Sequence, residues 1–196
     1  MKATLHIICT AFKRVMPLQT LINSFIVQTD PNWRLHIIHD GKPPLEMYEV
    51  ITGYNDSRIT FTQTPEVHGA WGHINRNLVL KKLVGKPNDC VLITNDDNYY
   101  VPAFIELMLG SALTDVGVVY CDTVHSYFGY NVHKSKLKKN KIDMGAFIVN
   151  LPIAKQVGFK DIKKEADGIY AEKCMNVCKT KGLRTVYIEK PLFIHN

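Results

Sequence analysis

The chain alternates short apolar runs with segments of helical periodicity, and this alternation limits the folds it can adopt. In the first half, predicted strands and helices follow one another at Leu5–Cys9, Leu18–Val27, Trp33–His39, Leu45–Thr52, Ile59–Gln63, His73–Leu83, Val91–Thr94 and Pro102–Leu113. Strands separated by helices of this length form βαβ units. We therefore expect an α/β fold with a Rossmann-like, mostly parallel (mixed) central sheet flanked by helices.

The second half of the chain is predicted to continue the same sheet. Its expected strands and helices lie at Val116–Cys121, Ala146–Val149, Pro152–Val157, Gly168–Lys181 and Thr185–Ile188. An aromatic and then lysine-rich stretch runs from His125 to Lys141. No repeat, low-complexity segment or linker interrupts the 196 residues, and this length suits one domain with a substantial core. We expect a single domain over residues 1–196.

The basic charge balance limits the partners that the protein can have. A net charge of +6 and a pI near 9.0 favour anionic ligands or a loose attraction to acidic membranes. Much of this charge is local, because five lysines lie between Lys134 and Lys141 and three more lie between Lys160 and Lys164. Such a run is either a solvated loop or a mobile basic flap that closes over a diphosphate or an anionic acceptor. It lacks the fold signature of a nucleic-acid-binding domain, so no nucleic-acid partner is expected.

The cysteines indicate a reducing compartment. They are five in number and scattered, and only Cys174 and Cys178 lie one helical turn apart, without a second pair to complete a zinc spacing. Free thiols are typical of the cytoplasm. The apolar run near the start is too short for a signal peptide, and no segment reaches the roughly 18 apolar residues of a membrane span. We expect a cytoplasmic protein with at most peripheral membrane contact.

Two adjacent carboxylates follow the apolar run Val91–Thr94. Asp96 and Asp97 are placed at the carboxyl end of a buried strand, where open α/β sheets bind their ligands. Neighbouring carboxylates repel each other unless a cation, a hydroxyl group or a helix N-terminus takes up the charge. Hard ions such as Mg²⁺ and Mn²⁺ are bound by one or two carboxylates together with substrate phosphates. The alternative is an Asp-Asp-Asn turn that caps the next helix.

Four segments occur in an order that resembles family-2 glycosyltransferases of the GT-A fold, which use nucleotide-diphospho-sugars. They are the loop Thr10-Ala11-Phe12-Lys13-Arg14, the segment from Gln28-Thr29 to Asp40-Gly41, the pair Arg76-Asn77, and the pair Asp96-Asp97. The resemblance covers about residues 4–110 well and the remainder loosely. It implies that about residues 1–110 bind the nucleotide sugar and about residues 111–196 bind the acceptor.

The resemblance implies roles for the residues of the first half. Asp40 matches the residue that accepts a hydrogen bond from the uracil N–H, Thr10 and Phe12 match contacts to the base, and Arg76 belongs to the nucleotide pocket. Asp96 binds the ribose, and Asp97 binds a Mn²⁺ or Mg²⁺ ion that bridges the two phosphates. The alternatives are an Asp-Gly turn at Asp40 and a surface helix charge at Arg76. The family more often has Tyr at Phe12, and Thr94 replaces the first Asp of the longer metal motif.

The resemblance places a general base in the second half. Asp167 matches the catalytic carboxylate, although Ala166 stands where the family usually has Glu, so Glu165 is an alternative base and an N-cap is an alternative role for Asp167. Asp143 is a candidate for binding an acceptor hydroxyl. His195 is a candidate metal ligand or an ordinary terminal histidine.

His73 gives two further alternatives. The segment Trp71-Gly72-His73 forms part of a donor loop, or His73 caps the third helix.

These features predict a metal-dependent glycosyltransferase. It moves a sugar from a nucleoside-diphosphate sugar, UDP before GDP or dTDP, to a hydroxyl of a glycan or other acceptor. Direct displacement with inversion is expected, and retention is the alternative, because the sequence does not fix where a nucleophile would lie. One alternative is a catalytically degenerate module that binds sugar nucleotides or glycans. The other is a sugar nucleotidyltransferase, which is disfavoured because the loop from Thr10 to Arg14 contains no glycine.

Overall fold

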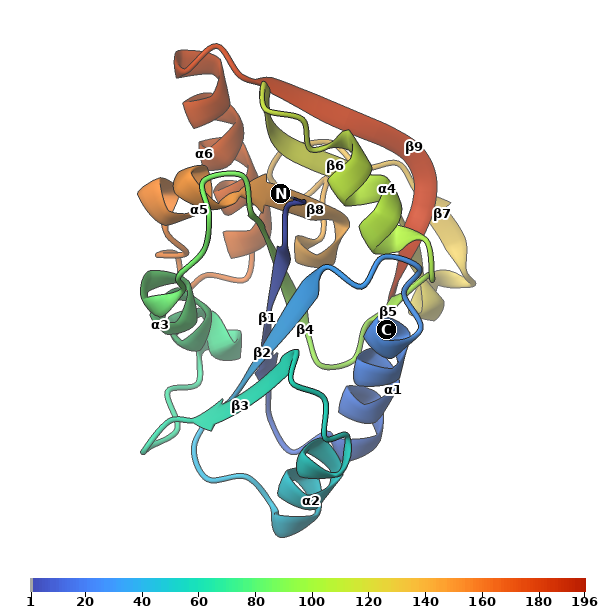
Figure 1. Ribbon diagram of the computed structural model, residues 1–196, viewed down its shortest axis with the longest axis vertical. Coiled ribbons are helices and arrows are strands. Elements are labelled where there is room, and N and C mark those ends of the chain that lie inside the picture. The colour runs from blue at the N-terminus through green and yellow to red at the C-terminus, as the bar shows by residue number, and fades with distance from the viewer. Residues whose placement is uncertain (1) are drawn as a thin grey trace.

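A mixed β-sheet runs through the whole molecule in the computed structural model, which describes residues 2–196 (Figure 1). In this part of the chain nine strands join in the order β3-β2-β1-β4-β8-β6-β9-β5, and β7 pairs with β6 at the side. Strands β3, β2, β1 and β4 are parallel, whereas β8 runs antiparallel to both β4 and β6. The expected single-domain α/β architecture with a mixed sheet is confirmed.

The elements follow the predicted order. The strands are β1 (Leu5–Ala11), β2 (Trp33–His39), β3 (Ile59–Gln63), β4 (Cys90–Asn95), β5 (Tyr99–Tyr100), β6 (Val116–His125), β7 (Asn131–His133), β8 (Phe147–Asn150) and β9 (Arg184–His195). The helices are α1 (Val15–Ile26), α2 (Leu45–Gly53), α3 (His73–Lys82), α4 (Phe104–Ser111), α5 (Leu151–Val157) and α6 (Ala166–Thr180). Short 3-10 turns lie at Ala70–Gly72, Ser126–Phe128 and Met144–Ala146. Within residues 2–196, no helix combines the length and apolar composition needed to span a bilayer.

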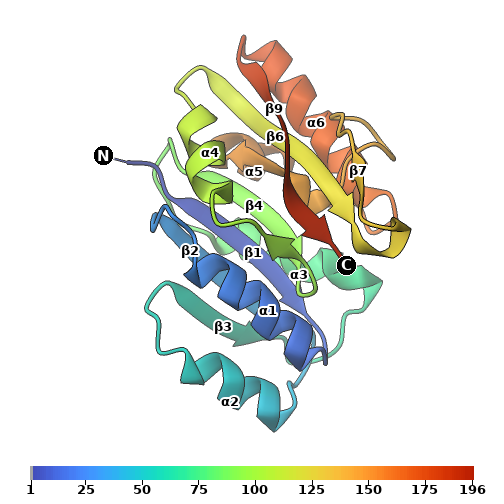
Figure 2. The same cartoon turned by 90° about the vertical axis from the view of Figure 1, so that its right-hand side faces the viewer.

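Helices cover both faces of the sheet. Helices α1, α2 and α4 lie on one face, and α3, α5 and α6 lie on the other (Figures 1 and 2). The buried positions of α1 follow a helical period along one side, at Leu18, Leu21, Ile22 and Phe25. Strand β1 lies in the middle of the sheet and is buried along its whole length, as a strand covered on both faces must be.

The last strand is longer than expected and joins β5 to the rest of the sheet. The sequence predicts a strand only over Thr185–Ile188, but β9 continues to His195 and pairs in parallel with β6. Pro191 lies within it, where the ladder shifts register around Asp122. Because proline cannot donate to a β ladder, such an irregularity is what allows the strand to continue through it.

An aromatic stack fixes the end of β9 against the core. The ring of Phe193 stacks on Tyr100 at a centroid distance of 5.3 Å, and Tyr100 stacks on Phe25 at 4.9 Å. The Tyr100 hydroxyl donates to Oγ1 of Thr94, which is fully buried. Thr94 therefore holds the turn after β4 in place, and the C-terminal end of the chain is brought beside that turn.

Candidate active site

A cavity of about 490 Å³ opens where the carboxyl ends of β1, β2 and β4 meet. Such an edge is the usual ligand crevice of an open α/β sheet. The cavity is lined by most of the site residues predicted from the sequence, namely Thr10, Phe12, Asp40, Arg76, Asp96, Asp167 and His195. Both halves of the chain therefore contribute to one site.

Asp96 and Asp97 form the turn between β4 and β5. Asp96 is fully buried, and its Oδ2 accepts a hydrogen bond of 3.1 Å from the backbone N–H of Phe12. Burial raises the pKa of Asp96, and the positive charge of Arg14 opposes this shift. The two residues therefore lie in a turn, but neither caps the next helix, since the N-cap of α4 is Ala103 and has no side-chain cap hydrogen bond.

Arg14 was missed as a site residue in the sequence analysis. Its guanidinium donates to both Asp96 and Asp97, and it also lines the cavity. A signal was present, because Arg14 ends the loop on which the family resemblance rests. The structure shows that this loop brings a cation to the two carboxylates.

Asp40 organises the loop that follows β3. Its Oδ1 accepts hydrogen bonds from the backbone N–H of His68 (2.9 Å) and from the Asn75 side chain (2.8 Å), and its Oδ2 accepts one from the N–H of Gly69 (2.9 Å). Burial opposes ionisation, but these donors outweigh it and lower the pKa of Asp40. Because Oδ2 accepts one of these bonds and Oδ1 two, Oδ2 keeps capacity for a donor in the cavity.

The cavity wall between Gly69 and Gly72 has an unusual backbone. Ala70 (φ 49°) and Trp71 (φ 52°) lie in the left-handed region between two glycines that share it. Residues other than glycine in this region each cost about 1–3 kcal/mol, and such strain collects at ligand sites. A Cβ on Gly72 would lie 2.7 Å from Oγ1 of Thr10, so only glycine allows this close approach. Trp71 is 67% exposed and lines the cavity.

Arg76 is buried inside the site. It is 2% exposed, and its guanidinium donates to Oδ1 of Asn95 and to Nδ1 of His73. The alternative of a surface helix charge is therefore wrong. Arg76 is buried because α3 packs against β1, and Arg76 lies on the side of the helix that faces the cavity.

His73 does not cap α3. Its Nε2 donates to the carbonyl of Lys163 at 3.1 Å, so the ring reaches across to the other half of the chain. Burial, together with the charge of Arg76, lowers the pKa of His73 to about 4. The imidazole is therefore neutral at physiological pH and serves as the acceptor that orients Arg76.

Asp167 lies in the first turn of α6 and is mostly buried. Burial raises its pKa to about 6, the charge of Arg76 opposes this shift, and the charge of Asp143 adds to it. The N-cap position belongs to Glu165, and the carboxylate of Asp167 accepts a hydrogen bond from the backbone N–H of Met144. The N-cap alternative is therefore wrong, because the side chain turns across to another segment instead of back to its own helix.

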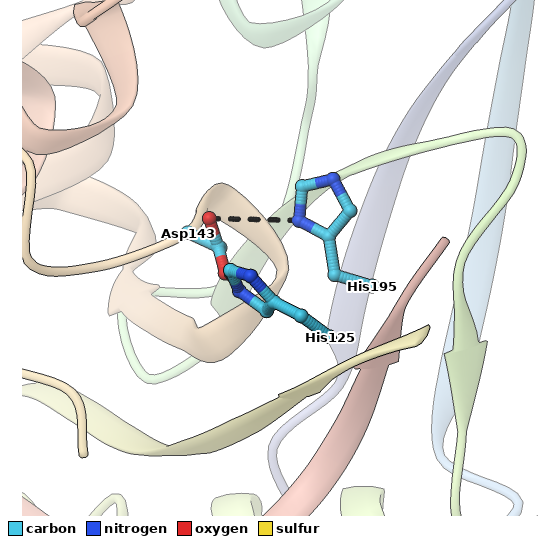
Figure 3. A group of neighbouring side chains, drawn as sticks. All are labelled: His125, Asp143 and His195. Atoms are coloured by element: carbon cyan, nitrogen blue, oxygen red, sulfur yellow. Dashed lines mark hydrogen bonds and ion pairs between the residues drawn. The ribbon is translucent and has the colours of Figure 1, made fainter. Parts of the chain in front are cut away.

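His125, Asp143 and His195 lie together, as Figure 3 shows, and His195 lines the cavity. Nε2 of His125 lies 2.6 Å from Oδ2 of Asp143, and Nδ1 of His195 lies 3.5 Å from Oδ1 of the same carboxylate. Burial alone would raise the pKa of Asp143, but the two histidines outweigh it and lower the pKa. His125 had no detectable signal in the sequence, because strand pairing alone brings it to residues far along the chain.

The donor atoms present fit a divalent cation. One ligand atom from each of His125, Asp143 and His195 lies within 4.8 Å of the others. Oδ1 of Asp97 is buried and has no hydrogen-bond partner within residues 2–196. The side chain of Asn196 donates to the carbonyl of Asp97 at 2.8 Å, so the last residues lie beside this carboxylate. Carboxylate and imidazole ligands together suit Mn²⁺.

Comparison with known proteins identifies the family. Residues 6–180 match the model described as Glycosyl transferase family 2. A comparison with curated proteins found no match.

Solved structures share the fold at low sequence identity. S. aureus TarS 1–349 matches with a TM-score of 0.76 and 16% identity, over 98% of this chain and 60% of that one. Its complex with UDP-GlcNAc matches with a TM-score of 0.75 and 16% identity, over 98% and 58% of the two chains. The mannosyltransferase PcManGT from Pyrobaculum calidifontis, in complex with GDP-Man and Mn²⁺, matches with a TM-score of 0.71 and 14% identity, over 100% and 57%.

The extent of these matches settles the fold and the family. The chain spans about 60% of the length of the TarS structure that it matches. The family model covers nearly the whole chain, and the sheet with its flanking helices is that of the GT-A structures. The chain therefore has the GT-A fold and belongs to glycosyl transferase family 2.

Proposed function

We propose that the protein is a metal-dependent transferase that moves a sugar from a UDP-sugar to a hydroxyl group of a glycan or other acceptor, with inversion. The observation that carries this proposal is the position of Asp167. It lines the donor cavity and also a second cavity of about 550 Å³ that lies beside it. A carboxylate at the junction of two cavities, with its pKa raised to about 6, suits the deprotonation of a hydroxyl that attacks from one cavity into the other.

The first half of the chain binds the nucleotide in this proposal. Oδ2 of Asp40 accepts the N–H of uracil, while Thr10 and Phe12 contact the base. Phe12 is 43% exposed and lies over His39 at a centroid distance of 5.9 Å, so one face of its ring is free to meet a base. The UDP-GlcNAc and GDP-Man complexes of the matched structures support a nucleotide-sugar donor.

The site's charges suit the diphosphate end of the donor. Asp96 binds the ribose hydroxyls, and the buried guanidinium of Arg76 faces the cavity. Asp97 and His195 hold the Mn²⁺ or Mg²⁺ ion, with His125 and Asp143 beside them. When bound, the metal supplies a Lewis acid that stabilises the charge on the departing diphosphate.

The residues of the chain then carry out a direct displacement. The acceptor hydroxyl lies beside Asp167 in the second cavity, and its oxygen attacks the anomeric carbon as the bond to the nucleoside diphosphate breaks. Asp167 takes the hydroxyl proton, and the diphosphate leaves with the electron pair of the broken bond. Glu165 lines only the acceptor cavity, which makes it the less suitable base.

The five cysteines support a location in a reducing compartment. All five are buried and free in the structure. Burial raises the pKa of Cys9, Cys90 and Cys121, which keeps these thiols protonated and unreactive. We therefore assign the protein to the cytoplasm, with no nucleic-acid partner and at most peripheral contact with a membrane.

Nucleotide binding and its metal dependence can be tested by thermal unfolding. The protein is heated with UDP, GDP or dTDP, each with and without Mn²⁺. We expect UDP to raise the unfolding temperature only with Mn²⁺, and Asp97→Ala to abolish that rise, because a bound ligand stabilises the folded state. No response to any nucleotide would refute the proposal.

Base function is tested separately by hydrolysis of UDP-sugars, in which water replaces the acceptor. Asp167→Asn should abolish hydrolysis and leave UDP binding intact, and Glu165→Gln is the matched control that keeps both. A passive binding module would bind UDP without hydrolysing it. Loss of activity in Glu165→Gln alone would transfer the role of base to Glu165.

A further inference from the structure

The second cavity has a cationic rim that the donor reaction does not need. It shares Asp167 and Lys164 with the donor cavity, so whatever enters it lies beside the base. Its floor consists of the partly buried carboxylates Asp143, Glu165 and Asp167, and its rim consists of the exposed lysines Lys134, Lys141 and Lys164. A ligand in this cavity therefore meets carboxylates at one end and ammonium groups at the other.

Buried apolar side chains and a hydrogen bond connect the lysine segment, residues 134–141, to the rest of the fold. Leu137 and Ile142 are buried in the hydrophobic core at its centre and end. The backbone N–H of Ser135 donates to Oδ1 of the buried Asp122 at 3.0 Å. The five lysine side chains are exposed, as expected for a solvated loop, while the buried Ser135 and Leu137 between them anchor the segment.

The lysine segment also packs directly against the start of the helix that carries the base. A Cβ on Gly168 would lie 2.5 Å from Cα of Lys139, so glycine at this position is what permits the contact. The backbone N–H of Lys139 donates to the side chain of Glu172 at 2.9 Å. The segment is thus positioned against α6, one residue from Asp167.

The charge of this rim is largely uncompensated. The lysine segment contains five lysines and no acidic residue, and Lys164 also lines the cavity. Lys134 pairs with Asp122 and Glu189, but no carboxylate in residues 2–196 pairs with Lys141 or Lys164.

We propose that the second cavity takes an anionic acceptor, which presents a hydroxyl to Asp167 and one or more phosphate, sulfate or carboxylate groups to Lys141, Lys164 and the rest of the rim. The inference rests on the proposed function for the identity of the site as an acceptor site. Exposed ammonium groups attract anions through long-range charge, and acidic groups on the floor select a polar, hydroxyl-bearing end. A neutral glycan has hydroxyl groups for the carboxylates of the floor but no negative charge for the lysines of the rim.

The test measures binding of four fluorescently labelled tetramers of matched length by anisotropy. They are a heparin-derived sulfated tetrasaccharide, a hyaluronan tetrasaccharide with carboxylates, a glycerol phosphate tetramer, and the neutral maltotetraose. The protein is first saturated with UDP and Mn²⁺, so that the donor cavity is filled. We expect at least one anionic tetramer to bind, more weakly at higher salt, and the neutral one not to bind. The tetramer that binds most tightly identifies the anionic group.

Two charge-matched double variants locate the binding. Lys141→Ala with Lys164→Ala should weaken the anionic tetramer about three- to tenfold, as expected for two exposed charges. Lys179→Ala with Lys181→Ala removes the same charge from the far end of α6 and should leave binding unchanged. Equal loss in both variants would show only a general attraction to a basic protein, and equal binding of maltotetraose would show a neutral acceptor. Either result, or no anionic binding, overturns the proposal.

The same samples separate this inference from the donor site. Thermal stabilisation by UDP and Mn²⁺ is recorded for each variant, and the Lys141→Ala single variant should retain it fully because Lys141 lines only the second cavity. Absence of UDP stabilisation in the wild type refutes the proposed function, whatever the tetramers do. In a separate sample prepared without UDP, displacement of a bound tetramer on addition of UDP and Mn²⁺ would place the anion in the donor cavity and refute the acceptor assignment.

Discussion

Substitution of Asp167 by Asn tests the proposed base through both activity and stability. Burial raises the pKa of this carboxyl from an ordinary 3.8 to about 6, against the opposing charge of Arg76. A shift of about two units corresponds to about 3 kcal/mol of unfavourable ionisation in the folded state. Asp167 is therefore a group that reduces stability at neutral pH, which is common for a catalytic residue.

The sign of the pH dependence follows from the raised pKa. Between about pH 4 and pH 6 the folded protein binds the proton that the unfolded chain has already lost, so this group's contribution to stability falls as the pH rises through that window. The destabilisation is complete above about pH 6. Asparagine removes it but replaces the oxygen that accepts from Met144 with a weaker acceptor, so we expect a net gain of about 1–2 kcal/mol at pH 7.5. That gain corresponds to a rise of roughly 2–8 °C in unfolding temperature.

Asp167→Asn should lower the activity although it raises the stability. The ionised base is about 90% populated at pH 7 and about 10% at pH 5, so UDP-sugar hydrolysis should fall on the acid side with a midpoint near pH 6. Asp167→Asn should lower the rate about 10²- to 10⁴-fold at pH 7.5. Carbon-13 NMR of the side-chain carboxyl groups follows the same titration without substrate.

The measurements therefore combine a rate profile, an NMR titration and thermal unfolding at pH 4 and 7.5. Glu165→Gln is the control and should keep the acid limb near pH 6. An acid limb that persists in Asp167→Asn, or an Asp167→Asn protein that is less stable than the wild type at pH 7.5, would refute the assignment.

Three further changes test the geometry around the base. Arg14→Gln removes the guanidinium that bridges the two adjacent carboxylates, so calorimetry should show tighter binding of Mn²⁺ to the nucleotide-free protein. Unchanged or weaker binding would show that Arg14 and the ion do not compete for Asp97. His195→Ala should reduce the Mn²⁺-dependent stabilisation by UDP and leave the unfolding temperature without ligands nearly unchanged; full retention of the UDP effect would exclude His195 as a ligand. Gly145→Ala places a methyl group 2.7 Å from the ring of Phe193 and should lower the free energy of unfolding by about 1–3 kcal/mol, measured by chemical unfolding. The fluorescence and circular-dichroism signals of the stacked Phe193 and Tyr100 rings should be lost, and no change in stability would show that the Phe193 ring moves freely.

Most of the first half of the fold could be predicted from the sequence because its signals are local. The strand ending at Asn95 contains the apolar run Val91–Ile93, and the strand ending at His39 places apolar residues at Trp33, Leu35, Ile37 and Ile38; the polar residues of the site follow both strands directly. Parallel strands end at the same edge of the sheet, so Asp40 and Asp96 had to lie close together. Arg14 and the burial of Arg76 were not predicted, because the direction in which a long charged side chain points depends on tertiary packing.

The second half was less predictable because its site residues are brought together by long-range strand pairing. The sequence around Pro191 contains two charged residues and a proline, which argue against a strand, and local propensity stops the element at Ile188. In the structure, pairing with β6 and packing of Phe193 on Tyr100 outweigh that propensity and carry the strand to His195. The pairing register of β6 and β9 places His195 opposite His125, and this brings His195 into the cavity that Asp167 also lines. A substitution that shifts this register should alter the candidate metal ligands and the proposed base together, without touching the half proposed to bind the nucleotide.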